Sequence, residues 1–301
     1  MKKVLKWIGI ILASLVGLLL VAAVALFAVG SARLNKIHNI QVETLAIPTN
    51  ETAVVRGRHL AEAITLCIAC HGDDLGGTVL DDEPGIVTIS ASNLTSGQGG
   101  VGATYSDGDY VRAIRHGVNP EGRGLIIMHS DIYHNLSAED LGAIIAYIKT
   151  MPPVDRELPT TRARPLGSIL VALGMFDMET MPLIPAEVID HSASFAAVPA
   201  PGMTAGYGHY LVTVGLCTMC HRGDLNGGPP LEPESPPVPN IAVYGGPTGW
   251  SEAEFVNTIR TGVTPYGKSL DPESMPWEFY QNMTDEELGA IWRYLQSVAG
   301  E

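Results

Sequence analysis

The chain has few cysteines, few aromatic residues and few basic residues. Four cysteines in 301 residues exclude a disulfide-dense scaffold. Phe, Trp and Tyr make up only 6% of the chain, which leaves little bulky apolar volume for a core. The 18 basic residues are outnumbered by 32 acidic ones, which argues against nucleic-acid binding. At 46% hydrophobic residues the composition is that of a folded protein, and the length allows two domains.

The N-terminus has the opposite charge from the rest of the chain. Residues 1–36 hold five basic residues and no acidic one, whereas the other 265 hold 13 basic and 32 acidic, a net −19. The uncharged run Trp7–Gly30 would reach ~36 Å as a helix, enough to cross a hydrocarbon core of ~30 Å. We expect an uncleaved, single-pass anchor in the cytoplasmic (inner) membrane. A cleaved signal peptide ending near Gly30–Ala32 is the alternative, and both put the remaining residues on the periplasmic or extracytoplasmic side.

All four cysteines fall in two CxxCH motifs, Cys67-Ile-Ala-Cys70-His71 and Cys217-Thr-Met-Cys220-His221. The pairs begin 150 residues apart, too far for an ordinary zinc site, and paired disulfides would leave both histidines unexplained. In this pattern two thiols one helical turn apart attach a porphyrin edge, and the histidine supplies the proximal iron ligand. The sequence therefore predicts two covalently bound haem c groups, attached through Cys67, Cys70, Cys217 and Cys220 and ligated by His71 and His221.

The two motifs belong to an internal duplication. Blocks on either side of them match at offsets of 145–151 residues, for example Leu141–Ile144 with Leu288–Ile291. The predicted segments are an anchor with flanks (1–36), a linker (37–54), a first domain (55–151), a proline-rich connecting strap (152–206) and a second domain (207–301).

Helical periodicity and capping residues predict the elements of each half. The haem motif is expected to end an N-terminal helix, and capping-box spacing predicts terminal helices beginning at Ser137 and Thr284. Gly117 and Gly262 fit positions just past helix ends. In the strap, Leu166–Met175 predicts one short apolar helix.

The sixth position of each iron is assigned to a methionine. Met128 and Met275 align with each other, 57 residues after His71 and 54 after His221. Two histidines compete for the first iron, His129 and His134, and neither has a counterpart in the second half. The other methionines near these segments are interpreted as packing residues: Met151, Met219 and Met283.

Four polar residues are candidates for contacts with haem propionates. Arg123 aligns with Lys268, and Asn93 and Asn240 occupy similar loops, although ordinary exposed positions are the favoured interpretation of all four. His191 in the strap is interpreted as a surface or hydrogen-bonded histidine rather than a ligand.

Both halves resemble class I c-type cytochromes: a CxxCH helix, a methionine loop, and a terminal helix such as Leu136–Tyr147. The resemblance covers ~195 residues and implies an all-α fold, so the expected fold class is an N-terminal transmembrane helix followed by two tandem cytochrome c domains. The whole chain is similar to membrane-anchored dihaem cytochromes and to haem subunits of periplasmic dehydrogenases. It departs from dehydrogenase cytochromes with three motifs, because it has two.

Two kinds of function remain open at this point, and a third is disfavoured. The chain is interpreted as a carrier of single electrons between a quinol-oxidising complex or dehydrogenase and an oxidase or soluble acceptor. Alternatively, it is a fixed haem subunit of a larger respiratory or dehydrogenase complex. A dihaem peroxidase needs an open iron position, which two His/Met sites would not provide. The acidic body predicts a redox partner with a basic docking face.

Overall fold

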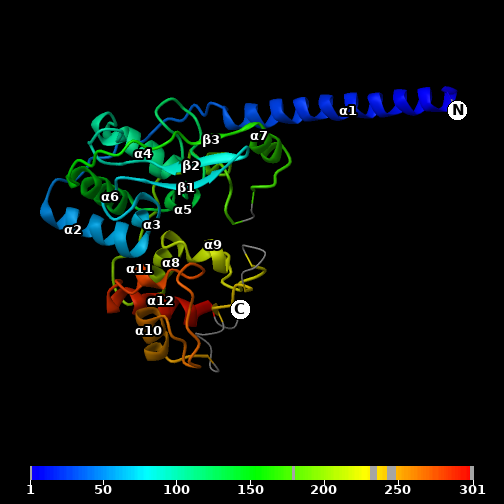
Figure 1. Cartoon of the computed structure of the whole chain (residues 1–301). Helices are drawn as coiled ribbons and strands as arrows, with labels where there is room; N and C mark the ends of the chain where they lie inside the picture. The colour runs from blue at the N-terminus through cyan, green and yellow to red at the C-terminus, as the bar shows by residue number, and fades with distance from the viewer. Residues whose placement is uncertain (1, 178–179, 231–235, 243–248, 299–301) are drawn as a thin grey trace.

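A computed structural model describes residues 2–177, 180–230, 236–242 and 249–298. The longest helix, α1 (Lys2–Leu34), projects from the rest of the chain, which forms two packed halves (Figure 1). By length and composition α1 can cross a membrane, a test that a signal sequence near an N-terminus also passes. The structure is mostly helical, as predicted.

The first half is built from short helices and a small sheet. Its elements are α2 (Glu51–His59), a π-helical turn η1 (Leu60–Ile64), α3 (Cys67–His71), β1 (Thr78–Glu83), β2 (Val87–Ala91), η2 (Val101–Ala103), α4 (Asp107–His116), α5 (Ser130–Tyr133) and α6 (Ala138–Thr150). The start of α6 is as predicted, since the Ser137 hydroxyl accepts a hydrogen bond from the backbone N–H of Asp140. Gly117 ends α4 with φ 64°, a left-handed conformation that glycine adopts without strain.

A sheet in the first half corrects the all-α prediction. β1 and β2 pair antiparallel, and β2 also pairs with β3 (Arg162–Ala163), which belongs to the strap. β-branched residues of β2 such as Val87 and Ile89 are buried. The third strand lies about 75 residues further along the chain, so local periodicity gave no sign of the pairing.

The second half repeats the helices of the first. Its elements are α8 (Ala205–Val214), α9 (Cys217–His221), α10 (Glu252–Thr261), α11 (Trp277–Tyr280) and α12 (Asp285–Val298). The predicted cap at Thr284 is confirmed, because its hydroxyl accepts from the Glu287 N–H while the Glu287 carboxylate accepts from the Thr284 N–H.

In both halves the first and last helices cross at a glycine. A Cβ on Gly57 of α2 would lie 1.9 Å from the carbonyl oxygen of Ala143 in α6. The corresponding distance from Gly208 of α8 to the carbonyl oxygen of Ala290 in α12 is 2.0 Å. Only a residue without a side chain lets the backbones approach this closely, so the same crossing geometry is encoded twice.

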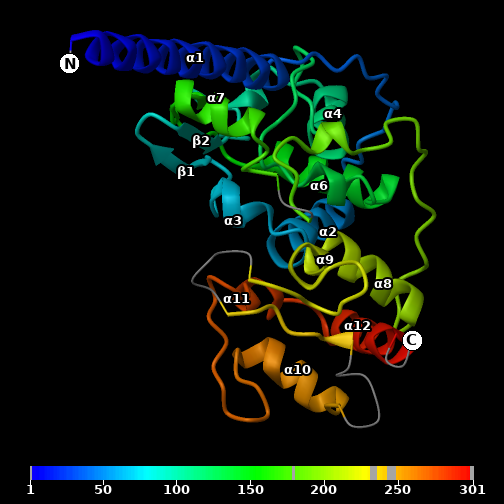
Figure 2. The same cartoon turned by 90° about the vertical axis from the view of Figure 1, so that its right-hand side faces the viewer.

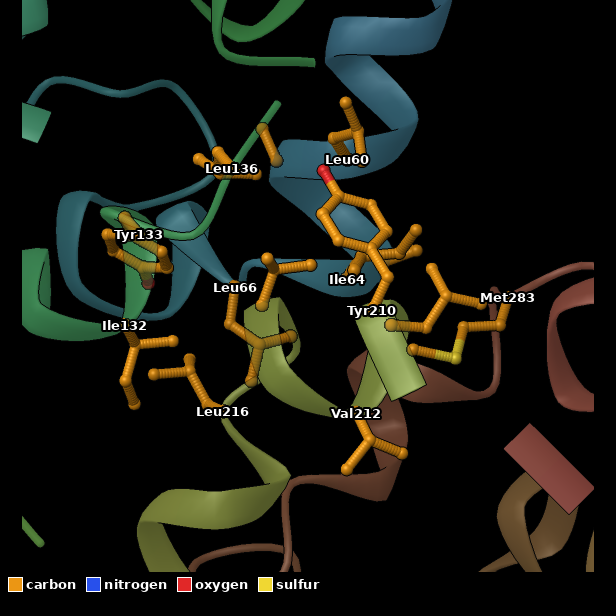
Figure 3. Packing of buried hydrophobic residues seen from close by; sticks show 14 of the residues in the cluster. Leu60, Ile64, Leu66, Ile132, Tyr133, Leu136, Tyr210, Val212, Leu216 and Met283 are labelled. Carbon is orange, nitrogen blue, oxygen red and sulfur yellow. The ribbon is translucent and has the colours of Figure 1, made fainter. Parts of the chain in front are cut away.

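One hydrophobic core runs through both halves. Leu60, Ile64 and Leu66 of the first half belong to one cluster of buried side chains with Tyr210, Leu216 and Met283 of the second (Figure 3). Because side chains from both halves bury one another, the halves form one packed body and are not separate units joined only by a linker.

Polar contacts across this core follow an approximate two-fold relation. His59 Nε2 lies 2.7 Å from a carboxylate oxygen of Glu287, and Tyr210 donates a 2.7 Å hydrogen bond to Asp140. His59 and Tyr210 are equivalent positions of the two first helices, and Glu287 and Asp140 are equivalent positions of the two last helices. Arg56 joins both carboxylates and so links the two contacts into one network.

The strap between the halves, predicted as residues 152–206, ends at Thr204 because α8 begins at Ala205, and it follows the first half for most of its length. It contains β3, α7 (Pro165–Ala172) and η3 (Pro185–Glu187). Arg156 pairs with Asp74, and α7 packs against α1. Met203 lies beside Gly289 of α12, where the strap reaches the second half.

Candidate functional site

Each CxxCH motif forms its own short helix, and a left-handed residue separates it from the helix before it. The sequence predicted that the motif ends a continuous helix, and this is wrong for both halves. Leu66 and Leu216, directly before the motifs, have φ of 52° and 64°, which stops the preceding helix and starts α3 and α9 in a new direction. A left-handed leucine is costly, so its recurrence at the same position indicates a local geometry held by the surrounding structure.

The four cysteine thiols are free in the structure. Burial raises the pKa of Cys67 to about 11 and that of Cys217 to about 12, so both thiols are protonated at neutral pH. The two cysteines of each motif lie on one helical turn beside the histidine. The paired disulfides considered from the sequence are not formed.

Both motif histidines use one ring nitrogen on a backbone carbonyl. The Nδ1 of His71 donates to the Ser92 carbonyl at 2.8 Å, and the Nδ1 of His221 donates to the Pro239 carbonyl at 3.0 Å. Burial lowers the pKa of both imidazoles, which favours the neutral form. With the proton fixed on Nδ1, the lone pair is on Nε2, the arrangement found in metal-binding histidines.

A cavity of about 840 Å³ opens beside the first motif. Cys67, Cys70, His71 and Met128 all line it, although Met128 lies more than 50 residues away in the sequence. Much of the wall is apolar and includes Leu94, Tyr105, Tyr110, Ile114, Leu136 and Ile144. Its volume and apolar wall fit a large flat cofactor, and its thiols and neutral imidazole are the groups that attach and ligate haem c.

The structure reduces the candidates for the sixth ligand of the first iron from three residues to two, Met128 and His129. Ile127, directly before Met128, has φ 61°, and its N–H donates to the Leu183 carbonyl, so the strap holds this turn. His129 lines the same cavity, and burial lowers its pKa to about 4. His134 does not line the cavity, and its Nδ1 lies 3.2 Å from the Arg115 carbonyl.

The second half places its predicted residues in the same relation to the core. Met275 and Cys217 both pack against the hydrophobic core. Three other methionines pack there as well, in agreement with their interpretation as packing residues: Met151, Met219 and Met283.

The propionate candidates have different environments. Asn93 and Arg123 both line the cavity, but the Asn93 amide already donates to the Val154 carbonyl and accepts from the Thr95 N–H. Arg123 is exposed. Lys268 is exposed, and Asn240 donates to Asn226. His191 is hydrogen-bonded as expected, to His116 and to the Ala186 carbonyl.

Two buried tyrosines hold the chain near the motifs, a role that was not predicted from the sequence. Tyr133 donates a 2.6 Å hydrogen bond to the Thr65 carbonyl, and Tyr280 donates one of 2.6 Å to the Gly215 carbonyl. Both carbonyls lie two residues before the first cysteine of a motif. The two tyrosines align in the duplication, which was the available signal, but nothing in the local sequence indicated their distant partners.

Comparison with known proteins identifies part of the chain. Residues 206–299 match the family described as Cytochrome c. This chain therefore contains a cytochrome c domain. It is 26% identical over 279 residues to the cytochrome c subunit of alcohol dehydrogenase (quinone) from Komagataeibacter europaeus, covering 83% of this chain and 57% of that protein. It is 28% identical over 286 residues to the gluconate 2-dehydrogenase cytochrome c subunit of Pantoea cypripedii, covering 84% and 61%.

A third relative is much longer. It is a nicotinate dehydrogenase subunit of Pseudomonas putida, 27% identical over 268 residues, which cover 82% of this chain and 21% of that protein. The chain thus spans about one fifth to three fifths of the length of these relatives. The family match and the names of these two cytochrome c subunits agree with the prediction of a c-type cytochrome.

Proposed function

We propose that the chain is a dihaem c-type cytochrome subunit that transfers single electrons on the outer face of the cytoplasmic membrane. In this proposal Cys67 and Cys70 hold one haem and Cys217 and Cys220 the other. His71 and His221 ligate the irons through Nε2, with Met128 and Met275 as the sixth ligands. The haem iron supplies the one-electron redox chemistry, and the protein supplies attachment, ligands and an apolar wall.

The observation that carries the proposal is the cavity of the first half. It gathers two thiols, a neutral imidazole and a methionine in an apolar space of about 840 Å³. These groups come from α3 and from the turn before α5, which the fold brings together. The first half lies outside the matched residues 206–299, so this geometry supports its haem independently of the family match.

Repeated contacts support a second haem of the same kind. The left-handed leucine, the Nδ1–carbonyl bond of the histidine, the tyrosine–carbonyl bond and the glycine crossing occur in both halves. The second half is also the part that matches the cytochrome c family.

The contacts between α1 and the strap favour a fixed subunit of a complex over a mobile electron carrier. Arg33 at the end of α1 pairs with Asp177 and Glu187 of the strap, each at 2.8 Å. Gly30 packs against Ser168 of α7. An anchor held in this way keeps the first half at one height above the membrane, as a complex with a dehydrogenase subunit requires. A mobile carrier between a quinol-oxidising complex and an oxidase is the alternative.

Haem content tests the proposal. We expect two haems per chain by pyridine haemochrome analysis, haem stain that survives denaturing electrophoresis, and one haem after Cys67→Ser with Cys70→Ser. A ratio of one in the unaltered protein contradicts the second site. Co-purification from native membranes with a dehydrogenase subunit separates the fixed subunit from the mobile carrier.

The sixth ligands are tested by substitution with a neighbouring control. Met128→Ala and Met275→Ala should each abolish the near-infrared methionine-to-iron band of one haem and lower one reduction potential. His129→Ala should leave the band unchanged. The reverse result, loss of a signal with His129→Ala and none with Met128→Ala, would assign His129 to the first iron.

A further inference from the structure

A short apolar segment of the strap lies beside α1. α7 packs along the end of α1, as two views of the chain agree (Figures 1 and 2). The closest approach is at Gly30, where a Cβ would lie 1.8 Å from the Ser168 carbonyl oxygen. This crossing fixes the position of residues 165–176 relative to α1.

Large apolar side chains of this segment are exposed. Leu166 is 49% exposed, Leu173 55% and Met175 67%. On the neighbouring part of α1, Phe27 and Val29 are 41% and 60% exposed. Single exposed apolar residues are common on protein surfaces, but here several lie on α1, on α7, which contacts it, and in the turn that follows α7.

The length of α1 places the crossing at the membrane surface. With Trp7, directly after Lys6, as the first residue in hydrocarbon, about 20 residues cross a core of ~30 Å. The span then ends near Phe27, and Gly30 lies a further ~5 Å out along the helix axis. That height falls in the headgroup layer, which adds ~5–8 Å on each side of the hydrocarbon.

The charged side chains around residues 165–176 are compatible with a position in the headgroup layer. Arg33 pairs with both Asp177 and Glu187 and offsets part of their negative charge, and Arg162, close to the start of α7, is exposed. Exposed Asp81 on β1 belongs in water and limits how deeply this side of the first half can sink. Apolar side chains with nearby basic residues are the pattern of a segment lying in the interface.

We infer that residues 165–176 form a second membrane contact, which lies in the headgroup layer of the bilayer that α1 crosses. The lipid covers Leu166, Leu173 and Met175. With α1 this makes two contacts, which fix the orientation of the first half and hold its cavity, lined in part by Phe27 and Leu34, close to the membrane surface. The inference rests on the uncleaved anchor of the proposed function.

Two methionines of the chain provide an internal test. Met175 is 67% exposed and Met203, in the same strap but next to the second half, is 52% exposed. The full-length haem protein is placed one chain per nanodisc of phosphatidylethanolamine and phosphatidylglycerol and footprinted with hydroxyl radicals. Sulfoxide formation is followed by peptide mass spectrometry and normalised to the unfolded chain. We expect Met175 to react several-fold more slowly than Met203.

A charge variant and the mass of the chain separate the outcomes. Leu173→Glu should raise the Met175 rate toward that of Met203, whereas Val188→Glu, at a residue 63% exposed, should leave it unchanged. Equal rates for Met175 and Met203 in the anchored protein overturn this inference alone. An intact mass that begins beyond Gly30 overturns both this inference and the uncleaved anchor.

Discussion

Two tyrosine hydroxyls hold the chain directly before the haem motifs. Tyr133 and Tyr280 are buried, and each donates to a carbonyl two residues before a motif. Burial raises the pKa of both phenols, so they stay protonated and remain donors. At the scale of single residues, this contact and the histidine–carbonyl bonds set the position of each motif.

Loss of a tyrosine hydroxyl should destabilise the protein. Tyr133→Phe leaves the buried Thr65 carbonyl without its partner, which costs about 1–3 kcal/mol. The free energy of unfolding from urea denaturation measures the change, and Tyr280→Phe should behave alike. Tyr266 is 84% exposed, so Tyr266→Phe is the control and should have no effect. Equal stability of all three variants would contradict the role given to the two buried hydroxyls.

The carboxylate of Glu287 makes stability depend on pH. It is 4% exposed, and its contacts with His59, the Thr284 N–H and Arg56 outweigh desolvation and lower its pKa. Because the carboxylate is favoured in the folded state, its contribution is present above the unfolded pKa of ~4.3 and is lost as pH falls through the lower folded value. Glu287→Gln should therefore reduce the loss of stability in acid. Glu273→Gln, at an exposed carboxylate of the same half, should leave the pH profile unchanged.

At the scale of secondary-structure elements, the N-caps of helices could be predicted from the sequence, whereas the pairing of strands could not. The starts of α6 and α12 follow from Ser137 and Thr284, because an N-cap depends on residues three positions apart. The strands β1 and β2 form a local hairpin that was not predicted, and β3, which pairs with β2, is distant in the sequence. The break before α3 was missed because leucine rarely adopts the left-handed conformation found at Leu66.

The candidate site was predictable as far as its motifs reach. Cys67, Cys70 and His71 followed from spacing, and Met128 from the duplication, and the structure places all of them around one cavity. Two contacts could not be predicted: the backbone carbonyl that orients the His71 ring, and the hydrogen bond from the Asn93 amide to the Val154 carbonyl of the strap. Both depend on segments brought together only by the tertiary fold.

The glycine crossings are a testable property of the helix pairs. Gly57→Ala places a Cβ 1.9 Å from the Ala143 carbonyl, so α2 and α6 must separate, at a cost of about 1–3 kcal/mol. Gly108→Ala in α4 has open space, with the nearest atom at 3.8 Å, and should be neutral or stabilise by about 0.4–1 kcal/mol. Denaturant midpoints measure both. A neutral Gly57→Ala would contradict the close crossing.

At the scale of the whole molecule, charge and attachment define what a partner meets. The residues after position 36 carry a net −19, and haem propionates would add to it. A body of this charge favours encounter with basic proteins. The even spread of acidic residues was evident from the sequence, whereas the packing of both halves into one core was not.

Electron exchange with a small basic redox protein should slow as salt is added. Screening shortens the range of the attraction, with a Debye length of ~10 Å at 0.1 M ionic strength. Stopped-flow reduction rates measured across ionic strengths test this. Reduction by an uncharged hydroquinone is the control and should change little. A rate that does not depend on salt would contradict the predicted basic docking face.

The approximate two-fold relation between the halves has a consequence for the direction of electron flow. A two-fold axis exchanges the halves, so a symmetric pair of sites has no preferred donor side. A preferred direction of electron transfer must therefore come from positions at which the two halves differ. His59 stands where the second half has Tyr210, and α1 with its partner α7 lies on the side of the first half. These differences between the halves would set the direction of electron transfer through the chain.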